Sequence, residues 1–170
     1  MSTSRILQLQ RGFTLIELLV TLAILALLLL MAAPLASDWG HGSRTLQARG
    51  ALIQGFAQAK ALALRNPCEA PNGTGAHAAT LEAQTDGTTI TLNVLAQGDG
   101  TCTYLDADAR PNPQWSASLP AGVTLILGGT TLAPGTPLKL ELDNRGTSAA
   151  DAPFILRRGG NQNDETGTLH

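Results

Sequence analysis

The feature that most constrains this chain is an apolar run of 21 residues, positions 13–33, in which only Thr14, Glu17 and Thr21 are polar. As an α-helix rising ~1.5 Å per residue, the run would span roughly 30 Å, which is about the thickness of a bilayer core. An acidic residue within such a segment costs about 2.5–3.5 kcal/mol on insertion scales. Glu17 therefore indicates either that the segment is more than a simple anchor or that its carboxylate has a partner.

A cleaved secretory signal is one interpretation of this run. Its apolar core, however, exceeds the ~7–15 residues of such signals. Residues 31–37, MAAPLAS, offer small residues for a cleavage site, so this alternative stays open. A segment that is discarded would nevertheless have no need of Glu17.

The junction RGFTLIE supports a different cleavage point. It joins a basic leader of 12 residues, which contains Arg5 and Arg11, to a phenylalanine and to a glutamate at the fifth position from Phe13. This junction resembles the class III signal of type IV pilins and pseudopilins. The resemblance implies that a prepilin peptidase cuts after Gly12 and methylates the new amine of Phe13, and that Glu17 is the acid used in assembly.

The implied assembly mechanism accounts for the acidic residue. The amine released at Phe13 has a reference pKa of about 8 and is cationic near neutral pH. In a filament, Glu17 of an incoming subunit would pair with the Phe13 amine of its neighbour. Buried pairs of this kind specify register more than they stabilise.

Pro34 is the 22nd residue counted from Phe13, a place where pilins often carry a proline. Inside a helix, a proline removes one backbone hydrogen bond and produces a kink or a melted turn. The alternative is that Pro34 simply ends the membrane helix.

With 170 residues, the chain has room for one globular domain and an appendage. The predicted organisation is a cleaved leader (1–12), a transmembrane and assembly helix (13–33), a periplasmic continuation of the helix (34–67) and a β-rich periplasmic domain (68–170). The predicted fold class is α+β and pilin-like, with the long N-terminal helix packed against an antiparallel β-sheet domain.

Helical periodicity returns from Ser43. The main apolar stripe is expected at three- and four-residue steps, with a second set of residues widening it. The main stripe comprises Leu46, Gly50, Ile53, Ala57, Lys60 and Leu64, and the widening set comprises Leu52, Phe56, Ala59 and Ala63. Asn66-Pro67 is expected to end the helix, and Gly40 and Gly42 are expected to interrupt it.

Beyond the helix, alternating residues and turn sequences predict five to seven antiparallel strands. The predicted strands are residues 88–97, 101–106, 114–119, 123–127, 138–142 and 154–158. The last twelve residues are polar and are expected to be partly mobile.

Two of these segments resemble the GspH/FimT family of minor pseudopilins. They are ALIQGFAQAKALALRN, at the end of the helix, and LKLELDNRGTSAADAPFILRR, a pair of strands around a turn. The chain departs from the family at Lys60, where arginine is common, and it lacks a clear GR-x-R ending.

Cys68 and Cys102 both follow the apolar run. If the basic leader lies in the cytoplasm, both thiols lie in an oxidising compartment. A bridge between them would contribute roughly 3–4 kcal/mol on the chain-entropy model. Two unrelated buried thiols are the alternative.

The net charge of −2 becomes −4 without the two leader arginines, since 9 basic residues then face 13 acidic ones. Nucleic acid is therefore a disfavoured ligand. His41, His77 and His170 lack neighbours at metal-ligand spacing, and GDG (98–100) and DADAR (106–110) do not fit a calcium loop. No nucleophile elbow or P-loop is present, so neither an enzyme nor a cofactor or metal is expected.

The resemblance implies a minor pseudopilin of a type II secretion system. Such a subunit would lie in the bacterial inner membrane as a single-pass protein with its C-terminal domain in the periplasm. Its partners would be other pseudopilins, the prepilin peptidase, the inner-membrane assembly platform and the bilayer. One alternative is a minor type IV pilin of the FimT or FimU kind, for pilus assembly, twitching motility or DNA uptake. A periplasmic binding module that merely shares the anchor is another, and its mature chain could start near Ser37.

Overall fold

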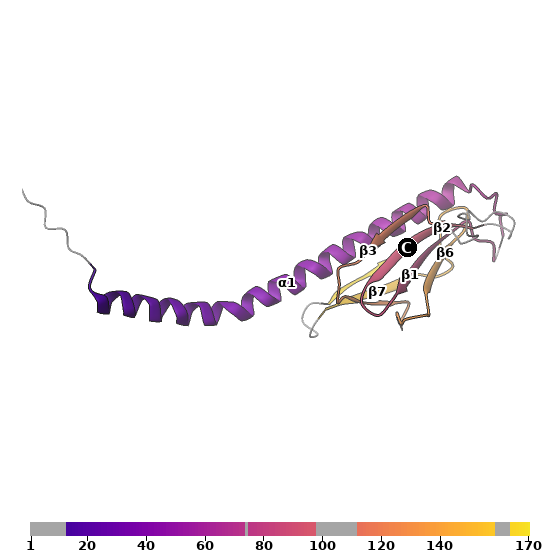
Figure 1. The fold of residues 1–170 in the computed structure, drawn as a ribbon. Helices are drawn as coiled ribbons and strands as arrows, with labels where there is room; N and C mark the ends of the chain where they lie inside the picture. Colours follow the sequence, from indigo (N-terminus) through magenta and orange to yellow (C-terminus); the bar gives the residue numbers. More distant parts are fainter. Residues whose placement is uncertain (1–12, 74, 98–111, 159–163) are drawn as a thin grey trace, which may run out of the picture. The chain divides into compact units, whose positions relative to one another are not determined.

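The structure is a computed structural model that describes residues 13–73, 75–97, 112–158 and 164–170, with only the backbone for residues 32–41. The chain divides into two compact units, Met1–Asp38 and Trp39–His170. The first unit contributes the start of a helix, and the second holds the rest of that helix and all the strands of the described chain (Figure 1).

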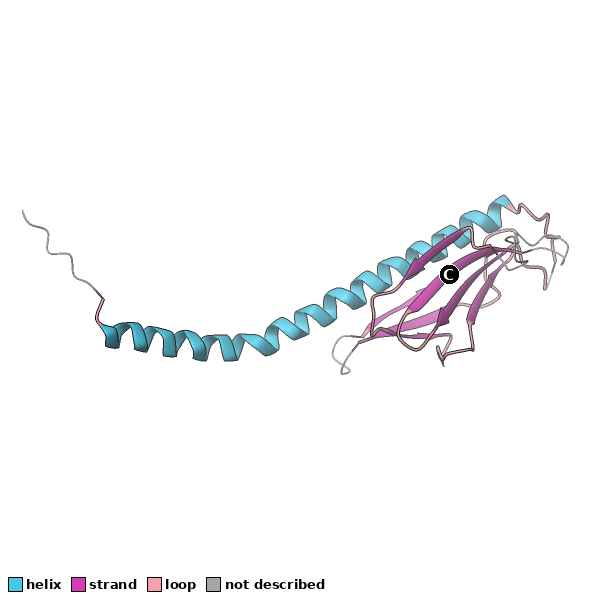
Figure 2. Cartoon of the chain, viewed as in Figure 1, coloured by secondary structure: helices cyan, strands magenta, loops and turns pink. Residues whose placement is uncertain are grey.

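Helix α1 runs from Leu15 to Arg65 as one α-helix of 51 residues (Figure 2). The predicted interruption near Gly40 and Gly42 is therefore wrong, and so is the alternative in which Pro34 ends the helix. The fixed φ of proline is compatible with helical backbone, so a proline costs a helix hydrogen bond without necessarily ending it. A glycine inside a helix likewise costs only about 1 kcal/mol relative to alanine.

The C-terminal end of α1 lies where the sequence predicts it. Asn66 has a φ of 42°, a left-handed conformation that ends helices. Its side-chain amide donates to the carbonyl of Ala70 at 3.0 Å, and its Oδ1 accepts from the Ala70 N–H at 2.7 Å. Asn66 thus closes the turn that leads into the β domain.

Eight described strands form two antiparallel sheets of four strands each. One sheet has the order β3-β2-β1-β6 and the other β5-β4-β7-β8. The strands are β1 (Ala79–Thr85), β2 (Ile90–Ala96), β3 (Trp115–Ser118), β4 (Thr124–Leu127), β5 (Thr130–Thr131), β6 (Leu138–Leu142), β7 (Ala152–Arg157) and β8 (Glu165–Leu169).

Five predicted strands are confirmed within one or two residues, namely β2, β3, β4, β6 and β7. The predicted strand at 101–106 lies outside the described residues. The sequence prediction missed β1, β5 and β8. Of the tail that was expected to be partly mobile, residues 165–169 form β8, and residues 159–163 lie outside the described residues. The tail sequence ETGTL is polar, but it pairs with β7 over its whole length, with Gly167 opposite Phe154.

Strand β1 was missed because polar residues break its apolar pattern. Thr80 and Glu82 alternate with Leu81 and Ala83, yet all four side chains are buried. Glu82 lies directly opposite Lys139 of β6, and the two side chains form an ion pair of 3.3 Å. This cross-strand partner is what allows a carboxylate to lie in the middle of the sheet.

One contiguous core joins both sheets and the second half of α1. The helix contributes a buried face at three- and four-residue steps. This face consists of Thr45, Ala48, Leu52, Phe56, Ala59 and Ala63. The predicted main stripe is therefore wrong: Leu46, Ile53 and Leu64 are exposed, and the residues expected to widen the stripe form the core face instead.

This face is buried, rather than the predicted main stripe, because its small residues allow the strands to pack close to the helix. A Cβ on Gly55 would lie 2.9 Å from Cζ3 of Trp115 and 3.2 Å from Cδ1 of Leu81, so β3 and β1 approach the helix backbone itself. On the other flank, Lys60 donates to the carbonyl of His170 at 2.6 Å. Figure 1 shows this half of α1 running along the strands.

Candidate assembly site

The first half of α1 presents apolar side chains on all its sides. Every large hydrophobic residue between positions 13 and 31 is more than half exposed, from 51% at Val20 to 81% at Phe13 and Leu15. A helix that is apolar all round requires an apolar environment on every side. In the part of the chain that the structure describes, no helix is both long enough and apolar enough to cross a membrane.

Glu17 lies in the first turn of α1, at an exposed position. Its backbone N–H donates to Oγ1 of Thr14 at 3.3 Å, which makes Thr14 the N-cap of the helix. Thr14 and Glu17 have the threonine-x-x-glutamate spacing of a capping box. This local signal was not among the features from which the helix was predicted. A carboxylate in the first turn also interacts favourably with the positive end of the helix dipole.

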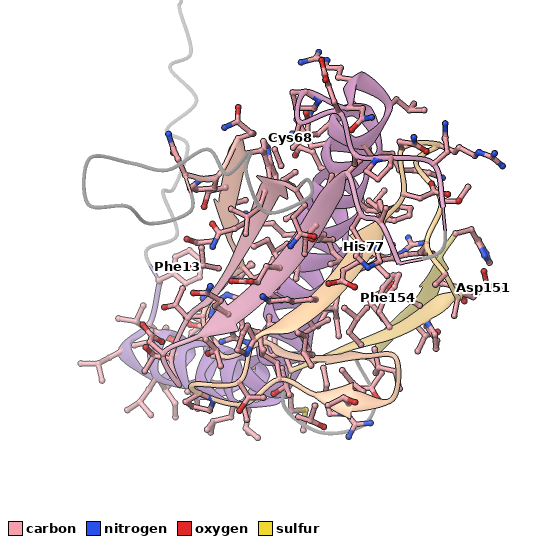
Figure 3. All side chains as sticks on the ribbon, turned by 90° about the vertical axis from the view of Figure 1, so that its right-hand side faces the viewer. Phe13, Cys68, His77, Asp151 and Phe154 are labelled. Atoms are coloured by element: carbon pink, nitrogen blue, oxygen red, sulfur yellow. The ribbon has the colours of Figure 1, made fainter. Side chains whose placement is uncertain are left out.

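These contacts orient the backbone around Glu17 but leave its charge available. None of the ion pairs among the described residues involves Glu17. Phe13 immediately precedes the N-cap, and Figure 3 labels it at the start of the described chain. Gly12, the expected cleavage residue, lies outside the described residues. The methylation, cleavage and pairing roles therefore stay predictions.

The other predicted site residues are distant from Glu17 in the sequence. Pro34 lies within α1, and only its backbone is described. Cys68 is 7% exposed and follows the end of the helix. Cys102 lies outside the described residues, so the bridge between the two cysteines stays a prediction.

Histidines of the β domain meet carboxylates that are distant in sequence. His77 Nε2 lies 3.0 Å from Oε2 of Glu141, and His170 Nδ1 lies 3.0 Å from Oδ1 of Asp151, which precedes β7 (Figure 3). The first pair lines a polar pocket of about 360 Å³ between the loop after α1 and the loop after β6. Within the described residues, no three His, Cys, Asp or Glu side chains are arranged to hold a metal ion.

Two arginines at the end of β7 make contacts within the protein. Arg157 donates from Nε and Nη2 to the carboxylate of Asp164 at 2.7–3.1 Å, and this lowers the pKa of Asp164. Arg158 donates to the carbonyl of Ala121. Both contacts hold the end of β7 in place, and they reduce the number of donors available for phosphates.

One protein-family match covers the N-terminal segment of the chain. Residues 7–33 match the Prokaryotic N-terminal methylation motif. The N-terminal segment is type IV pilin-like. The motif spans the end of the leader and the apolar run, and it implies processing by a prepilin peptidase and assembly with other pilins. No significant match to the chain was found among the curated proteins or the solved structures.

The match and the fold agree on the pilin-like arrangement. A long N-terminal helix, whose first part carries the methylation motif, continues into a domain of antiparallel sheets. The matched segment contains the exposed helix start, the capped turn and Glu17. These features together define the candidate assembly site, which consists of residues 13–31.

Proposed function

We propose that the protein is a minor pseudopilin of a type II secretion system. It would be a structural subunit that assembles into or caps a periplasmic filament for the export of folded proteins. The observation that carries the proposal is the helix start itself, where apolar side chains are exposed on all sides and a single acid lies in the first turn. That arrangement suits insertion among similar helices and is otherwise costly.

The proposed steps follow from the N-terminal segment. Cleavage after Gly12 would place a cationic amine on Phe13, one residue before the cap on Thr14. The carboxylate of Glu17 would then pair with the amine of an adjacent subunit, so that docking removes two uncompensated charges at once. The leader would lie in the cytoplasm, the helix start in the inner membrane and the β domain in the periplasm. A bridge between Cys68 and Cys102 would fit the oxidising periplasm.

Two measurements test this assembly role. Intact mass and N-terminal sequencing should show a mature chain that starts at a methylated Phe13; a chain that starts near Ser37 would instead identify a cleaved secretory signal. Glu17→Ala should insert into membranes normally but enter filaments poorly. Thr21→Ala is the matched control, because Thr21 is the next polar residue after Glu17 on this helix and its hydroxyl donates to the carbonyl of Leu18.

A minor type IV pilin is the alternative with the same assembly chemistry. The engagement of Arg157 and Arg158 within the β domain, together with the acidic net charge, favours secretion over DNA uptake. Deletion of the gene should therefore abolish release of folded proteins into the medium and leave twitching motility and transformation intact. Loss of motility with normal secretion would identify the alternative.

A further inference from the structure

The loop that follows α1 contains the dipeptide Asn72-Gly73. Both residues are exposed and lie in a bend, outside helix and strand. An asparagine that precedes a glycine can react with its own backbone, because the glycine has no Cβ to obstruct the approach of its nitrogen to the asparagine side chain. The hydrogen bonds around the dipeptide decide whether the two groups are available to each other.

The residue that follows Asn72 distinguishes it from the other described asparagines. Among the residues that the structure describes, none accepts a hydrogen bond from the Gly73 N–H. This nitrogen is therefore free to act as a nucleophile. The other described asparagines precede either a proline, which has no N–H, or a residue with a larger side chain: Asn66-Pro67, Asn93-Val94, Asn112-Pro113 and Asn144-Arg145.

The turn between β1 and β2 holds a related dipeptide, Asp86-Gly87, in which both groups are occupied. The Gly87 N–H donates to Oγ1 of Thr85 at 3.1 Å. Oδ1 of Asp86 accepts three hydrogen bonds of 2.7–2.8 Å from the two residues that follow Gly87. The loop after α1 provides no such bond for its glycine nitrogen, so the two dipeptides differ in reactivity because of the fold.

A second asparagine polarises the side chain of Asn72. Nδ2 of Asn144, in the loop after β6, donates to Oδ1 of Asn72 at 2.7 Å and to the carbonyl of Ala70 at 3.3 Å. A donor at Oδ1 withdraws electron density from Cγ and stabilises the negative charge that the oxygen carries after nucleophilic attack. Since the two asparagines are 72 positions apart, only the tertiary structure brings this donor to Asn72.

We propose that Asn72 is a site of spontaneous covalent modification, at which its side-chain amide becomes a carboxylate. The Gly73 nitrogen loses its proton to water and attacks Cγ of Asn72. The Cγ–Nδ2 bond then breaks, and the amide nitrogen takes up a proton and leaves as ammonia. Water opens the resulting cyclic succinimide at either carbonyl, which gives aspartate or isoaspartate at position 72. The net reaction consumes water and releases ammonia, and it is independent of the proposed assembly function.

The reaction changes the polar pocket that Asn72 helps to line. The wall of this pocket already carries the carboxylates of Glu141 and Asp143 and the guanidinium of Arg145. The product adds a negative charge there, and the isoaspartyl form also lengthens the backbone by one methylene group. Modified and unmodified molecules therefore differ in charge and in backbone geometry beside the C-terminal end of α1.

Peptide mapping of the incubated full chain tests the modification. A protease that cleaves after glutamate releases residues 70–82, in which Asn72 is the only side-chain amide. During incubation of the purified protein in detergent, this peptide should gain the mass that replacement of NH2 by OH adds. It should also accept methyl groups from an isoaspartyl methyltransferase. Residues 83–141 form the neighbouring peptide and should keep their mass, and a fresh sample digested in parallel gives the background.

Variants identify the reacting groups. Gly73→Ala should react at least about tenfold more slowly because its methyl group obstructs the nitrogen. It should fold normally, since an added Cβ meets nothing within 4 Å and φ at Gly73 is not left-handed. Asn144→Ala should react about two- to tenfold more slowly, the factor expected for one hydrogen bond. Ser148→Ala is its matched control, because that hydroxyl lies in the same loop and donates to the carbonyl of Ala150.

Three results would overturn the proposal. An unchanged mass of residues 70–82 in the folded chain, with a mass gain only after unfolding in urea, would show that the fold prevents the reaction. Equal rates in the wild type and in Gly73→Ala would show that the nitrogen of residue 73 is not the nucleophile. An unchanged or faster reaction in Asn144→Ala would show that the bond from Asn144 does not assist it.

Discussion

Two glycines of α1 make it possible to measure how tightly the helix packs on the β domain. Gly50 and Gly55 lie on the same helix, and either one replaced by alanine should gain about 1 kcal/mol of helix propensity. An added Cβ at Gly50 meets open space. At Gly55 it would lie 2.9 Å from Cζ3 of Trp115 and 3.2 Å from Cδ1 of Leu81.

The expected difference between the two variants follows from these distances. Leu81 is 1% exposed and cannot move into solvent, so the Gly55→Ala methyl must displace β1, β3 or the helix. Overpacking of a core costs about 1–3 kcal/mol. Gly50→Ala should therefore stabilise the protein by about 1 kcal/mol. Gly55→Ala should be neutral or destabilising by up to about 2 kcal/mol, since the two effects oppose each other.

Thermal unfolding of the full chain in detergent, followed by circular dichroism, measures this difference. At roughly 3 °C per kcal/mol for a chain of this size, the two variants should differ in Tm by about 3–9 °C, with Gly50→Ala the more stable. An equal rise in Tm for both variants would refute the close approach of Trp115 and Leu81 to the helix backbone.

Three further predictions concern the β domain and its contact with the helix. Gly167→Ala would place a Cβ 2.6 Å from Cζ of the buried Phe154 ring, so it should destabilise by about 1–3 kcal/mol in denaturant unfolding, while Thr168→Ala should not. Leu52→Ala should cost about 2–5 kcal/mol in the same assay because Leu52 is fully buried. Hydrogen bonds from the Thr89 and Thr88 backbone lower the pKa of Asp86 to about 2. The contribution of the ionised Asp86 carboxylate to the free energy of unfolding should therefore be complete above its unfolded pKa of about 3.9 and disappear as the pH falls through 2. An NMR titration of the Asp86 side chain would show the lowered pKa.

Local features of the sequence predict the elements that depend on neighbouring residues. The helix end at Asn66 and the strand at residues 138–142 are such cases, since the turn at Asn66-Pro67 and the alternation of Leu138, Leu140 and Leu142 are complete within a few residues. Strands β1 and β8 are different. Their sequences contain buried polar residues or a glycine, and partners distant in sequence hold them in the sheets, such as Lys139 for Glu82 and Phe154 for Gly167.

The choice between the two apolar stripes of α1 could not be predicted from periodicity. Both stripes repeat at helical spacing, so either could have formed the core face. Packing decided between them, since Gly55, Ala59 and Ala63 let the strands approach the helix backbone, whereas Leu46 and Ile53 would hold them away. The polar pair of His77 and Glu141, 64 positions apart, likewise exists only because the loop after α1 lies against β6.

The sequence by itself therefore determined the pilin-like character of the N-terminal segment, because the methylation motif is a local pattern within residues 7–33. Only the tertiary structure decided which face of the helix is buried and which is left exposed. The physical reason is that burial depends on complementary shapes contributed by residues far apart in the chain, such as Gly55 and Trp115, and no local pattern encodes that fit.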